Sequence, residues 1–353
     1  MILQPRSAAL LVVLLLAACA SGARYQGPVS DHFDGERFHN DEPFNVGWRE
    51  LWRYYREREP GEWTRDLTPP DFADPPARVA EGALQVTVIN HATVLIQIDG
   101  INLLTDPVWS ARASPVQWLG PKRFVAPGLR FEQLPPIDAV LISHDHYDHL
   151  DLPTLQRLQA AHQPQFIVGL GEDGWLREQG LEDVTALDWG EPVALNERVT
   201  VHGQRSQHWT GRGFGKGQRN RSLWMAYAIT APGGPVYFAG DTGYGDHFAD
   251  SGAAFGPFRL ALLPIGAYKP RWLTEYQHTS PEDAVQAHLD LAAVRSIAVH
   301  FGTFQLSEEA QIEPVDALAV ARSAAGLPEN DFIAPTFGQP YAIAALPAAP
   351  ELE

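Results

Sequence analysis

The chain has 353 residues, of which 45% are hydrophobic and 20% charged, so its composition is that of a globular protein with one large domain or two ordinary ones. It carries 26 lysines and arginines against 43 aspartates and glutamates, a formal net charge of −17 at pH 7. Because no basic run interrupts this acidic background, we expect no nucleic-acid partner.

The first 18 residues predict an export signal. Arg6 precedes an apolar run, Ala8–Ala18, that is too short to span a bilayer as a mature helix. The run ends in Leu16-Ala17-Ala18-Cys19, which resembles the lipobox of bacterial lipoproteins. This resemblance implies a signal peptide over residues 1–18 and a lipidated Cys19 that anchors the protein to a membrane. A plain secretory signal with a chance cysteine is the alternative.

Cys19 is the only cysteine of the chain, so it forms no intramolecular disulfide and leaves no thiolates for a cysteine-rich zinc site. Any metal ion must therefore bind imidazole and carboxylate groups. Ala20 and Ser21 follow the cysteine, and the absence of aspartate there resembles the sorting pattern of outer-membrane lipoproteins. This implies an exported protein on the outer membrane, facing the periplasm.

Residues 19–83 predict a tether and an N-terminal arm. This segment is rich in proline, arginine and aromatic residues and has little apolar periodicity. Four aromatic residues suggest that the arm packs on the domain that follows: Trp48, Trp52, Tyr54 and Tyr55.

Residues 84–353 predict one many-stranded α/β domain, because short apolar runs alternate with turns and helical stretches. The expected strands lie within Leu84–Ile98, Ile101–Leu104, Ala139–Ile142, Phe166–Val168, Val199–Val201, Trp224–Ile229, Val236–Phe238, Leu260–Leu263 and Ile297–Val299. The expected helices are Leu152–Ala161, Pro281–Ala293 and Glu313–Ala325, the second with Ser280 as its N-cap.

A dense cluster of imidazole and carboxylate groups follows the expected strand at 139–142, in the sequence Ser143-His144-Asp145-His146-Tyr147-Asp148-His149. His144 and His146, two positions apart, face one side and can bind one ion, while Asp148 and His149 turn toward a second. A solvated polar loop is the alternative, but so many polar groups at the mouth of a buried strand need partners.

Three further residues come after apolar runs or within polar turns: His208, Asp241 and His300. A lone histidine is more often a core or surface residue than a ligand. Together with the cluster at 144–149, however, they supply five histidines and two aspartates, enough for two ions with a bridging carboxylate and a place for water.

The motif at 144–149 and the later His, Asp and His resemble those of the metallo-β-lactamase superfamily, in the same order. The resemblance implies that one zinc ion binds His144, His146 and His208, that the other binds Asp148, His149 and His300, and that Asp241 bridges them. Iron and manganese suit the same ligands. It also implies an αβ/βα four-layer sandwich.

Several segments resemble, more narrowly, the N-acylphosphatidylethanolamine-hydrolysing phospholipase D family. They are Leu104-Thr105-Asp106-Pro107, Gly120-Pro121-Lys122-Arg123-Phe124, Leu134-Pro135-Pro136-Ile137-Asp138 and the stretch from Ile265 to Trp272 that continues through Tyr276-Gln277-His278. The resemblance implies that His278 lies near the substrate phosphate without binding metal. A structural histidine that caps the helix at Pro281 is the alternative. The loop Thr210–Arg221 departs from this resemblance, because its Gly- and Arg-rich sequence does not indicate a substrate.

A zinc-dependent phosphodiesterase of phospholipase D type follows as the expected function. Zinc lowers the pKa of bound water from about 15.7 toward about 7, and the resulting hydroxide attacks the phosphodiester of an N-acylphosphatidylethanolamine-like phospholipid. The expected catalytic residues are Asp148, Asp241 and His278, the last to protonate or orient the leaving oxygen. Asp145 and Tyr147 are candidates to orient the ligands, unless Asp145 faces solvent. Lys269, Arg271 and Arg123 are candidate phosphate contacts, or partners of structural ion pairs.

Other functions are compatible with parts of the same pattern. A lactonase or another hydrolase of carbonyl substrates would use the same metal motif, and only the segments around 266–278 favour phosphodiesters. A nuclease is disfavoured by the charge and the export signal. A lipoprotein that binds metal without catalysis is a third alternative, against which the full ligand set argues. The sequence does not determine the oligomeric state.

Overall fold

The computed structural model describes residues 25–42, 46–64, 66–212 and 218–347. The predicted signal peptide and Cys19 lie outside the described residues. Among the helices in these ranges, none has both the length and the apolarity needed to cross a bilayer.

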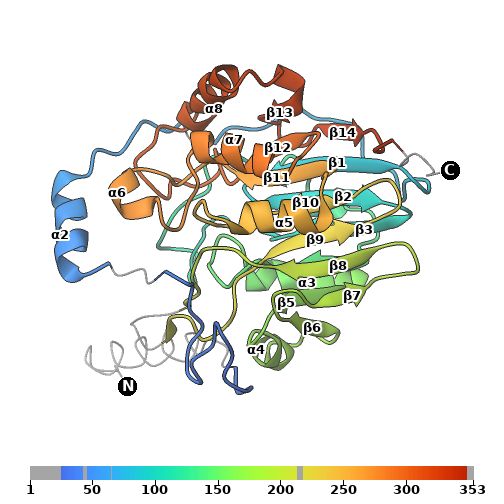
Figure 1. Ribbon diagram of the computed structural model, residues 1–353, viewed down its shortest axis with the longest axis horizontal. Coiled ribbons are helices and arrows are strands. Elements are labelled where there is room, and N and C mark those ends of the chain that lie inside the picture. The colour runs from blue at the N-terminus through green and yellow to red at the C-terminus, as the bar shows by residue number, and fades with distance from the viewer. Residues whose placement is uncertain (1–24, 43–45, 65, 213–217, 348–353) are drawn as a thin grey trace, which may run out of the picture.

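Two seven-stranded sheets form the centre of the molecule (Figure 1). The first has the spatial order β14-β1-β2-β3-β4-β5-β6 and the second β13-β12-β11-β10-β9-β8-β7. The strands of the first sheet are β1 (Leu84–Asn90), β2 (Thr93–Ile98), β3 (Ile101–Thr105), β4 (Ala139–Leu141), β5 (Gln165–Gly169), β6 (Val184–Leu187) and β14 (Pro340–Ile343). Those of the second are β7 (Pro192–Ala194), β8 (Thr200–Gln204), β9 (Ala226–Thr230), β10 (Val236–Phe238), β11 (Leu260–Pro264), β12 (Ser296–Val299) and β13 (Phe332–Ile333).

Helices surround the two sheets. They are α2 (Trp48–Glu57), α3 (Leu152–His162), α4 (Asp173–Glu178), α5 (His247–Phe255), α6 (Arg271–Thr274), α7 (Pro281–Asp290) and α8 (Glu313–Ala324), with short 3-10 turns at Phe131–Gln133 and Glu329–Asp331. Side chains of α3 and α4 pack against the first sheet, and those of α5, α7 and α8 against the second. A further apolar cluster fills the space between the sheets. The predicted four-layer sandwich is therefore confirmed.

The central strands are buried on both faces, which explains their nearly unbroken apolar runs. In the first sheet β3 to β6 run parallel, and β1 and β2 are antiparallel to their neighbours. In the second sheet β10 to β13 run parallel and β7 to β10 alternate in direction.

The predicted helices at 152, 281 and 313 are confirmed as α3, α7 and α8. Ser280 caps α7 as expected: its hydroxyl accepts from the Asp283 N–H at 3.2 Å, and the Asp283 carboxylate accepts from the Ser280 N–H at 2.9 Å. The helix ends earlier than predicted, at Asp290, since Ala292 takes a left-handed φ of 48°.

The arm contributes to the core through residues other than those expected. Phe33 and Phe38 are buried in the cluster between the sheets. Of the four aromatic residues expected to pack on the domain, only Tyr54 is half-buried, whereas Trp48, Trp52 and Tyr55 are exposed. That expectation was wrong for these three, which lie on the outer side of α2. The domain boundary at residue 84 stays a prediction.

Candidate metal centre

The polar residues of the site follow strands that end at one edge of each sheet. In the first sheet, His91 follows β1, Asp106 follows β3 and His144 lies just beyond β4, three strands that run in the same direction. In the second, His208, Asp241 and His300 come after β8, β10 and β12, which likewise share a direction. Ligands of α/β proteins characteristically bind at such carboxyl ends of strands.

Three imidazoles converge in a first group made of His144, His146 and His208. His144 Nε2 lies 2.8 Å and His208 Nε2 lies 3.3 Å from His146 Nδ1. Burial lowers the pKa of His146 to about 4 and holds the pKa values of the other two well below the ordinary range. The rings are therefore neutral at pH 7, which is the form in which imidazole binds metal.

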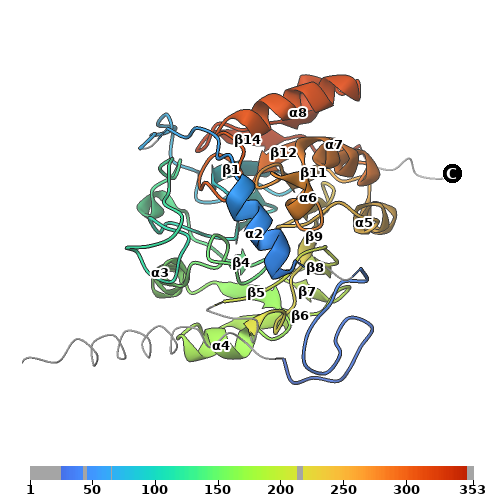
Figure 2. The ribbon, with the colours of Figure 1, turned by 90° about the vertical axis from the view of Figure 1, so that its left-hand side faces the viewer.

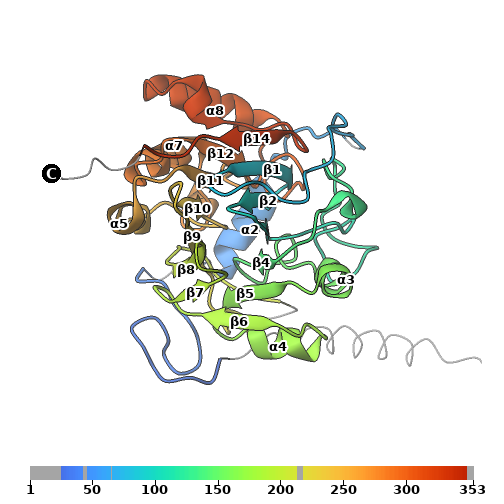
Figure 3. The ribbon, with the colours of Figure 1, turned by 90° about the vertical axis from the view of Figure 1, so that its right-hand side faces the viewer.

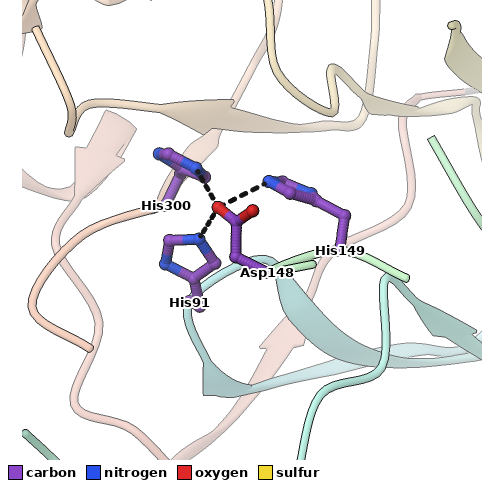
Figure 4. A group of neighbouring side chains, drawn as sticks. All are labelled: His91, Asp148, His149 and His300. Atoms are coloured by element: carbon purple, nitrogen blue, oxygen red, sulfur yellow. Dashed lines mark hydrogen bonds and ion pairs between the residues drawn. The ribbon is translucent and has the colours of Figure 1, made fainter. Parts of the chain in front are cut away.

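A second group surrounds the carboxylate of Asp148 (Figure 4). Asp148 Oδ2 lies 3.1 Å from His91 Nε2 and 3.4 Å from both His149 Nε2 and His300 Nε2. Three imidazoles from separate segments of the chain thus point at one carboxylate oxygen.

Asp241 lies between the two groups. Its Oδ2 is 3.2 Å from Nε2 of His149 and of His300, and 3.9 Å from His144 Nε2 and 3.8 Å from His208 Nε2. One carboxylate oxygen therefore faces donors of both groups. All seven residues that the sequence singled out as metal ligands are brought together here.

The charges of the cluster support one another despite burial. Burial opposes ionisation of Asp241 and Asp148, but His149 and its neighbours hold the pKa values of both carboxyls well below their usual range. Burial likewise opposes a charge on His149 and His300, yet the carboxylates raise the pKa of His300 to about 9 and that of His149 well above its ordinary value. In the absence of a metal ion, protons on these two histidines balance the carboxylates.

Outer partners orient several of the candidate ligands. His149 Nδ1 lies 2.6 Å from Asp106 Oδ2, and His208 Nδ1 donates to the Gln277 carbonyl at 2.9 Å. Such contacts fix the ring so that Nε2 faces the site. Asp106 takes the orienting role that was expected of Asp145. Both expectations for Asp145 were wrong. It is buried rather than solvent-facing, and its carboxylate accepts from the Gly211 N–H at 2.6 Å.

The cluster leaves an unusual number of buried polar atoms without a hydrogen-bond partner. They are Asp241 Oδ1, His146 Nε2, His149 Nε2, His278 Nδ1, His300 Nδ1 and His300 Nε2. Buried polar groups are otherwise almost always paired, because an unmade hydrogen bond in the interior is costly. Imidazole and carboxylate ligands at this density fit divalent cations such as zinc.

The comparison with known families agrees with this geometry. The model of the beta-lactamase superfamily domain matches residues 101–301. The chain belongs to the metallo-β-lactamase superfamily. Within this superfamily it belongs to the phospholipase D-like family that contains a Caenorhabditis elegans protein named N-acyl-phosphatidylethanolamine-hydrolyzing phospholipase D 1. The two are 39% identical over 250 residues, which is 68% of this chain and 70% of the worm protein.

Two further proteins are similar to this chain. An uncharacterised protein of Mycobacterium tuberculosis is 43% identical over 243 residues, or 67% of this chain, and the match spans 64% of its own length. The crystal structure of an isothiocyanate hydrolase from Delia radicum gut bacteria aligns with a TM-score of 0.58 at 20% identity, over 74% of this chain and all (100%) of that chain. The latter likeness concerns the fold alone.

A glycine allows Asp241 to reach the site. Gly240 follows β10 with a φ of 60°, and a Cβ there would lie 2.5 Å from the Cβ of Ser143. The turn into Asp241 therefore passes directly against the residue that precedes His144. Only glycine accommodates both the left-handed backbone and this close approach.

His278 lies beside the cluster, at its more open side. Its Nδ1 is 3.8 Å from Asp241 Oδ2, and its side chain keeps 15% of its surface exposed. Burial lowers the pKa of His278 to about 4, so the ring is neutral at pH 7. It does not cap α7, because Ser280 and Asp283 form that cap.

The three candidate phosphate contacts are engaged elsewhere. Lys269 forms an ion pair with Glu313, and Arg271 pairs with Asp283 at 2.7 Å. Arg123 is half-buried and donates to the carbonyls of Val108 and Ser110. The contacts therefore support the alternative of structural ion pairs for Lys269 and Arg271, whereas Arg123 binds backbone carbonyls instead.

His91 is the residue of the site that the sequence did not reveal. Burial lowers its pKa to about 3, so the ring is neutral; its Nε2 therefore donates to Asp148 while Nδ1 has no partner. It stands in the turn between β1 and β2 with a φ of 43°. That turn is hidden within the long apolar run Leu84–Ile98. The signal that marks it is a polar pair, Asn90-His91, inside an otherwise apolar stretch.

Proposed function

We propose that this protein is a dinuclear, zinc-dependent phosphodiesterase of phospholipase D type, acting on N-acylphosphatidylethanolamine-like phospholipids. The observation that carries the proposal is the shared carboxylate: Asp241 Oδ2 faces histidines of both ligand groups. The name of the C. elegans relative points to the same substrate class.

His144, His146, His208 and Asp241 would hold one ion, and Asp148, His149, His300 and Asp241 the other. Two bound divalent ions would neutralise phosphodiester oxygens and supply a water acidic enough to act as nucleophile near pH 7. No serine or cysteine nucleophile is then required. The balance of charge within the cluster supports this, because the protons on His149 and His300 would be exchanged for metal charge.

His278 would act on the leaving oxygen. A histidine whose pKa is lowered to about 4 is neutral at pH 7, so it donates a hydrogen bond rather than a whole proton. Of the two expected roles, protonating or orienting the leaving oxygen, we therefore assign His278 the orienting one. The products would be phosphatidate and an N-acylethanolamine.

Residues 1–18 and Cys19 support a location for this activity. We propose export as a lipoprotein, with the lipidated Cys19 in the outer membrane and the catalytic domain facing the periplasm. Such an anchor would keep the domain next to phospholipid substrate.

The test compares three substrates with one zinc-loaded preparation. The chain with Cys19→Ser is assayed by mass spectrometry on N-acylphosphatidylethanolamine, bis-p-nitrophenyl phosphate and a homoserine lactone. We expect phosphatidate and N-acylethanolamine from the first, and no products from the Asp241→Asn variant. The matched control Asp246→Asn, at an exposed position in the next turn, should retain activity. Opening of the lactone alone would assign the site to a carbonyl hydrolase instead.

A further inference from the structure

The outer side of α2 exposes a row of large apolar side chains. Trp48, Leu51, Trp52 and Tyr55 are 74%, 45%, 58% and 68% exposed. Their spacing of three and four residues places them on one side of the helix. We call this row the α2 face. Contiguous exposed apolar surface of this kind marks an interaction site in soluble domains.

Arginines flank the α2 face. Arg49, Arg53 and Arg56 form the next stripe around the helix, and all are exposed. The Arg49 guanidinium lies 5.5 Å from the Trp48 ring centroid and that of Arg56 lies 4.7 Å from the Trp52 ring centroid. Residues 48–58 contain four arginines against two glutamates, in a chain of net charge −17. This combination complements an anionic, partly apolar surface.

The chemistry of the α2 face fits the water–lipid boundary of a membrane. Helices that lie in that boundary bury tryptophan and leucine among the acyl chains and direct arginine or lysine to phosphate groups. Tryptophan and tyrosine favour the headgroup level in particular, because their rings are amphipathic. Arginine also offers a planar set of donors that matches phosphate.

The domain holds α2 in place from its inner side. The Arg53 guanidinium lies 4.3 Å from the ring centroid of Trp272 in α6, and Tyr54 is half-buried. Beyond the helix, Gly61 N–H donates to the Glu308 carbonyl at 2.7 Å. Before it, the Asn40 side chain donates to the carbonyl of His208, a candidate metal ligand, at 2.8 Å.

The α2 face lies on the side of the molecule where the metal centre is. Figure 2 shows α2 crossing the middle of this side, and Figure 3, from the opposite side, shows it behind the sheets. Helix α6 connects α2 to the metal centre. Its Trp272 contacts Arg53 of α2, and the carbonyl of its last residue, Thr274, accepts from the N–H of His278.

A second group of exposed apolar side chains lies on the loop before β4. Trp118 and Leu119 are 69% and 59% exposed. The neighbouring Gln117 lines a cavity together with Tyr147, which directly precedes the candidate ligand Asp148. The exposed pair thus directly follows a residue that shares a cavity with the loop of candidate ligands.

We propose that the α2 face, with Trp118 and Leu119, docks on a membrane surface rich in anionic phospholipid. Docking through these side chains turns the metal centre toward the headgroups. The docking itself is independent of the proposed activity; only its benefit, delivery of phospholipid to the centre, rests on that function.

The test measures binding of the full chain to vesicles, with Cys19→Ser in every variant so that no lipid anchor contributes. Sedimentation compares vesicles of phosphatidylcholine with vesicles that also contain phosphatidylglycerol. We expect binding to the anionic vesicles that weakens with salt. Trp48→Ser with Trp52→Ser should lower partitioning by about tenfold or more. Leu289→Ser with Val320→Ser, at exposed apolar positions of α7 and α8, should bind like the parent chain.

Two further variants distinguish a specific loss of binding from a loss caused by misfolding. Trp48→Phe with Trp52→Phe should keep most of the binding, because the apolar area is retained. Arg49→Gln with Arg56→Gln should remove the preference for phosphatidylglycerol. Parent-like binding by the serine variant, or a parent chain that ignores anionic vesicles, overturns the proposal.

A second copy of the chain is the competing occupant of the α2 face. If sedimentation equilibrium shows a dimer that the serine substitutions dissociate, and vesicle binding is absent, the face is a protein interface and the proposal is wrong. Vesicle binding that depends on the α2 face in a protein without phosphodiesterase activity would retain the docking and reject only the proposed function.

Discussion

The position of the Asp148 carboxylate depends on a hydrogen bond from the turn between β1 and β2. Its Oδ2 accepts from His91 Nε2 at 3.1 Å, and His91 is itself held by a bond from its own N–H to Thr303 Oγ1. We expect His91→Ala to lower metal affinity or activity by about 10- to 100-fold, the usual effect of removing a partner of a metal ligand.

Titration with zinc and a competing chelator measures this effect. His202→Ala, in a half-buried position on β8 away from the cluster, is the matched control and should bind metal like the parent. Equal affinities for the parent and the His91 variant would show that Asp148 needs no such support.

His278 should affect turnover rather than metal content. His278→Ala removes one hydrogen-bond donor to a charged oxygen, which we expect to lower kcat by about 10- to 100-fold while both ions stay bound. His278→Gln, which keeps an N–H donor, should recover part of the loss. Elemental analysis together with kinetics decides the matter, and loss of metal from the alanine variant would make His278 a ligand.

The candidate ligands differ in how readily their sequence revealed them. His144, His146, Asp148 and His149 crowd one loop after an obvious apolar run, so the chemistry was visible locally. His91 was not visible, because its turn interrupts an apolar run by only a few residues. The partnership of Asp106 with His149 joins residues 43 positions apart, and no local pattern encodes that contact.

The turn after β10 links the second sheet to the metal cluster. Gly240→Ala would add a Cβ 2.5 Å from Ser143 Cβ at a φ of 60°, so we expect it to destabilise the fold by more than the roughly 1–2 kcal/mol of a left-handed alanine and to lower metal content.

Gly180→Ala is the matched control for this turn. Gly180 also has a positive φ, of 90°, but a Cβ there would meet nothing within 4 Å. It should show the backbone cost alone, with normal metal content. Denaturant unfolding and metal analysis of both variants make the comparison; identical losses would mean that contact with Ser143 does not matter.

Glu172, just before α4, makes stability depend on pH. Burial, and then the charge of Asp145, raise its pKa from 4.5 to about 8. Between these pH values the folded chain binds more protons at this site than the unfolded chain, so its contribution to the free energy of unfolding falls as pH rises.

Glu172→Gln should remove this dependence. We expect the free energy of unfolding of the variant to match that of the parent near pH 4. Above pH 8 the variant should be more stable by about 1–3 kcal/mol, because the parent must then bury a charged carboxylate. Denaturant unfolding across this pH range measures it. Glu178→Gln, exposed on the same helix, is the control, and a constant difference between the Glu172 variant and the parent would contradict the assignment.

Elements were predictable where burial dictated the pattern. The central strands and α3, α7 and α8 carry continuous or periodic apolar residues, and their positions were confirmed. The edge strands β7 and β14 are only three and four residues long and expose every other residue, which gives too weak a signal. Helix α2 was missed because its apolar row faces outward, so its aromatic residues suggested docking on the domain instead.

At the scale of the whole molecule, the site exists only because two sheets end side by side. His144 and His149 come from the first sheet and His208, Asp241 and His300 from the second, so neither half holds both ligand groups. The sequence predicted which residues would meet through resemblance to a family, since local patterns do not encode the packing of one sheet on another. The architecture then explains why single residues scattered over 210 positions, from His91 to His300, form one cluster.

The most direct test of a phospholipase D-type reaction follows the oxygen of water. The zinc-loaded Cys19→Ser chain is incubated with N-acylphosphatidylethanolamine in water enriched in oxygen-18, and the products are analysed by mass spectrometry. We expect phosphatidate with one heavy oxygen on its phosphate and an unlabelled N-acylethanolamine. Heavy oxygen in a released fatty acid, or no phosphatidate from a protein with full metal content, would contradict it.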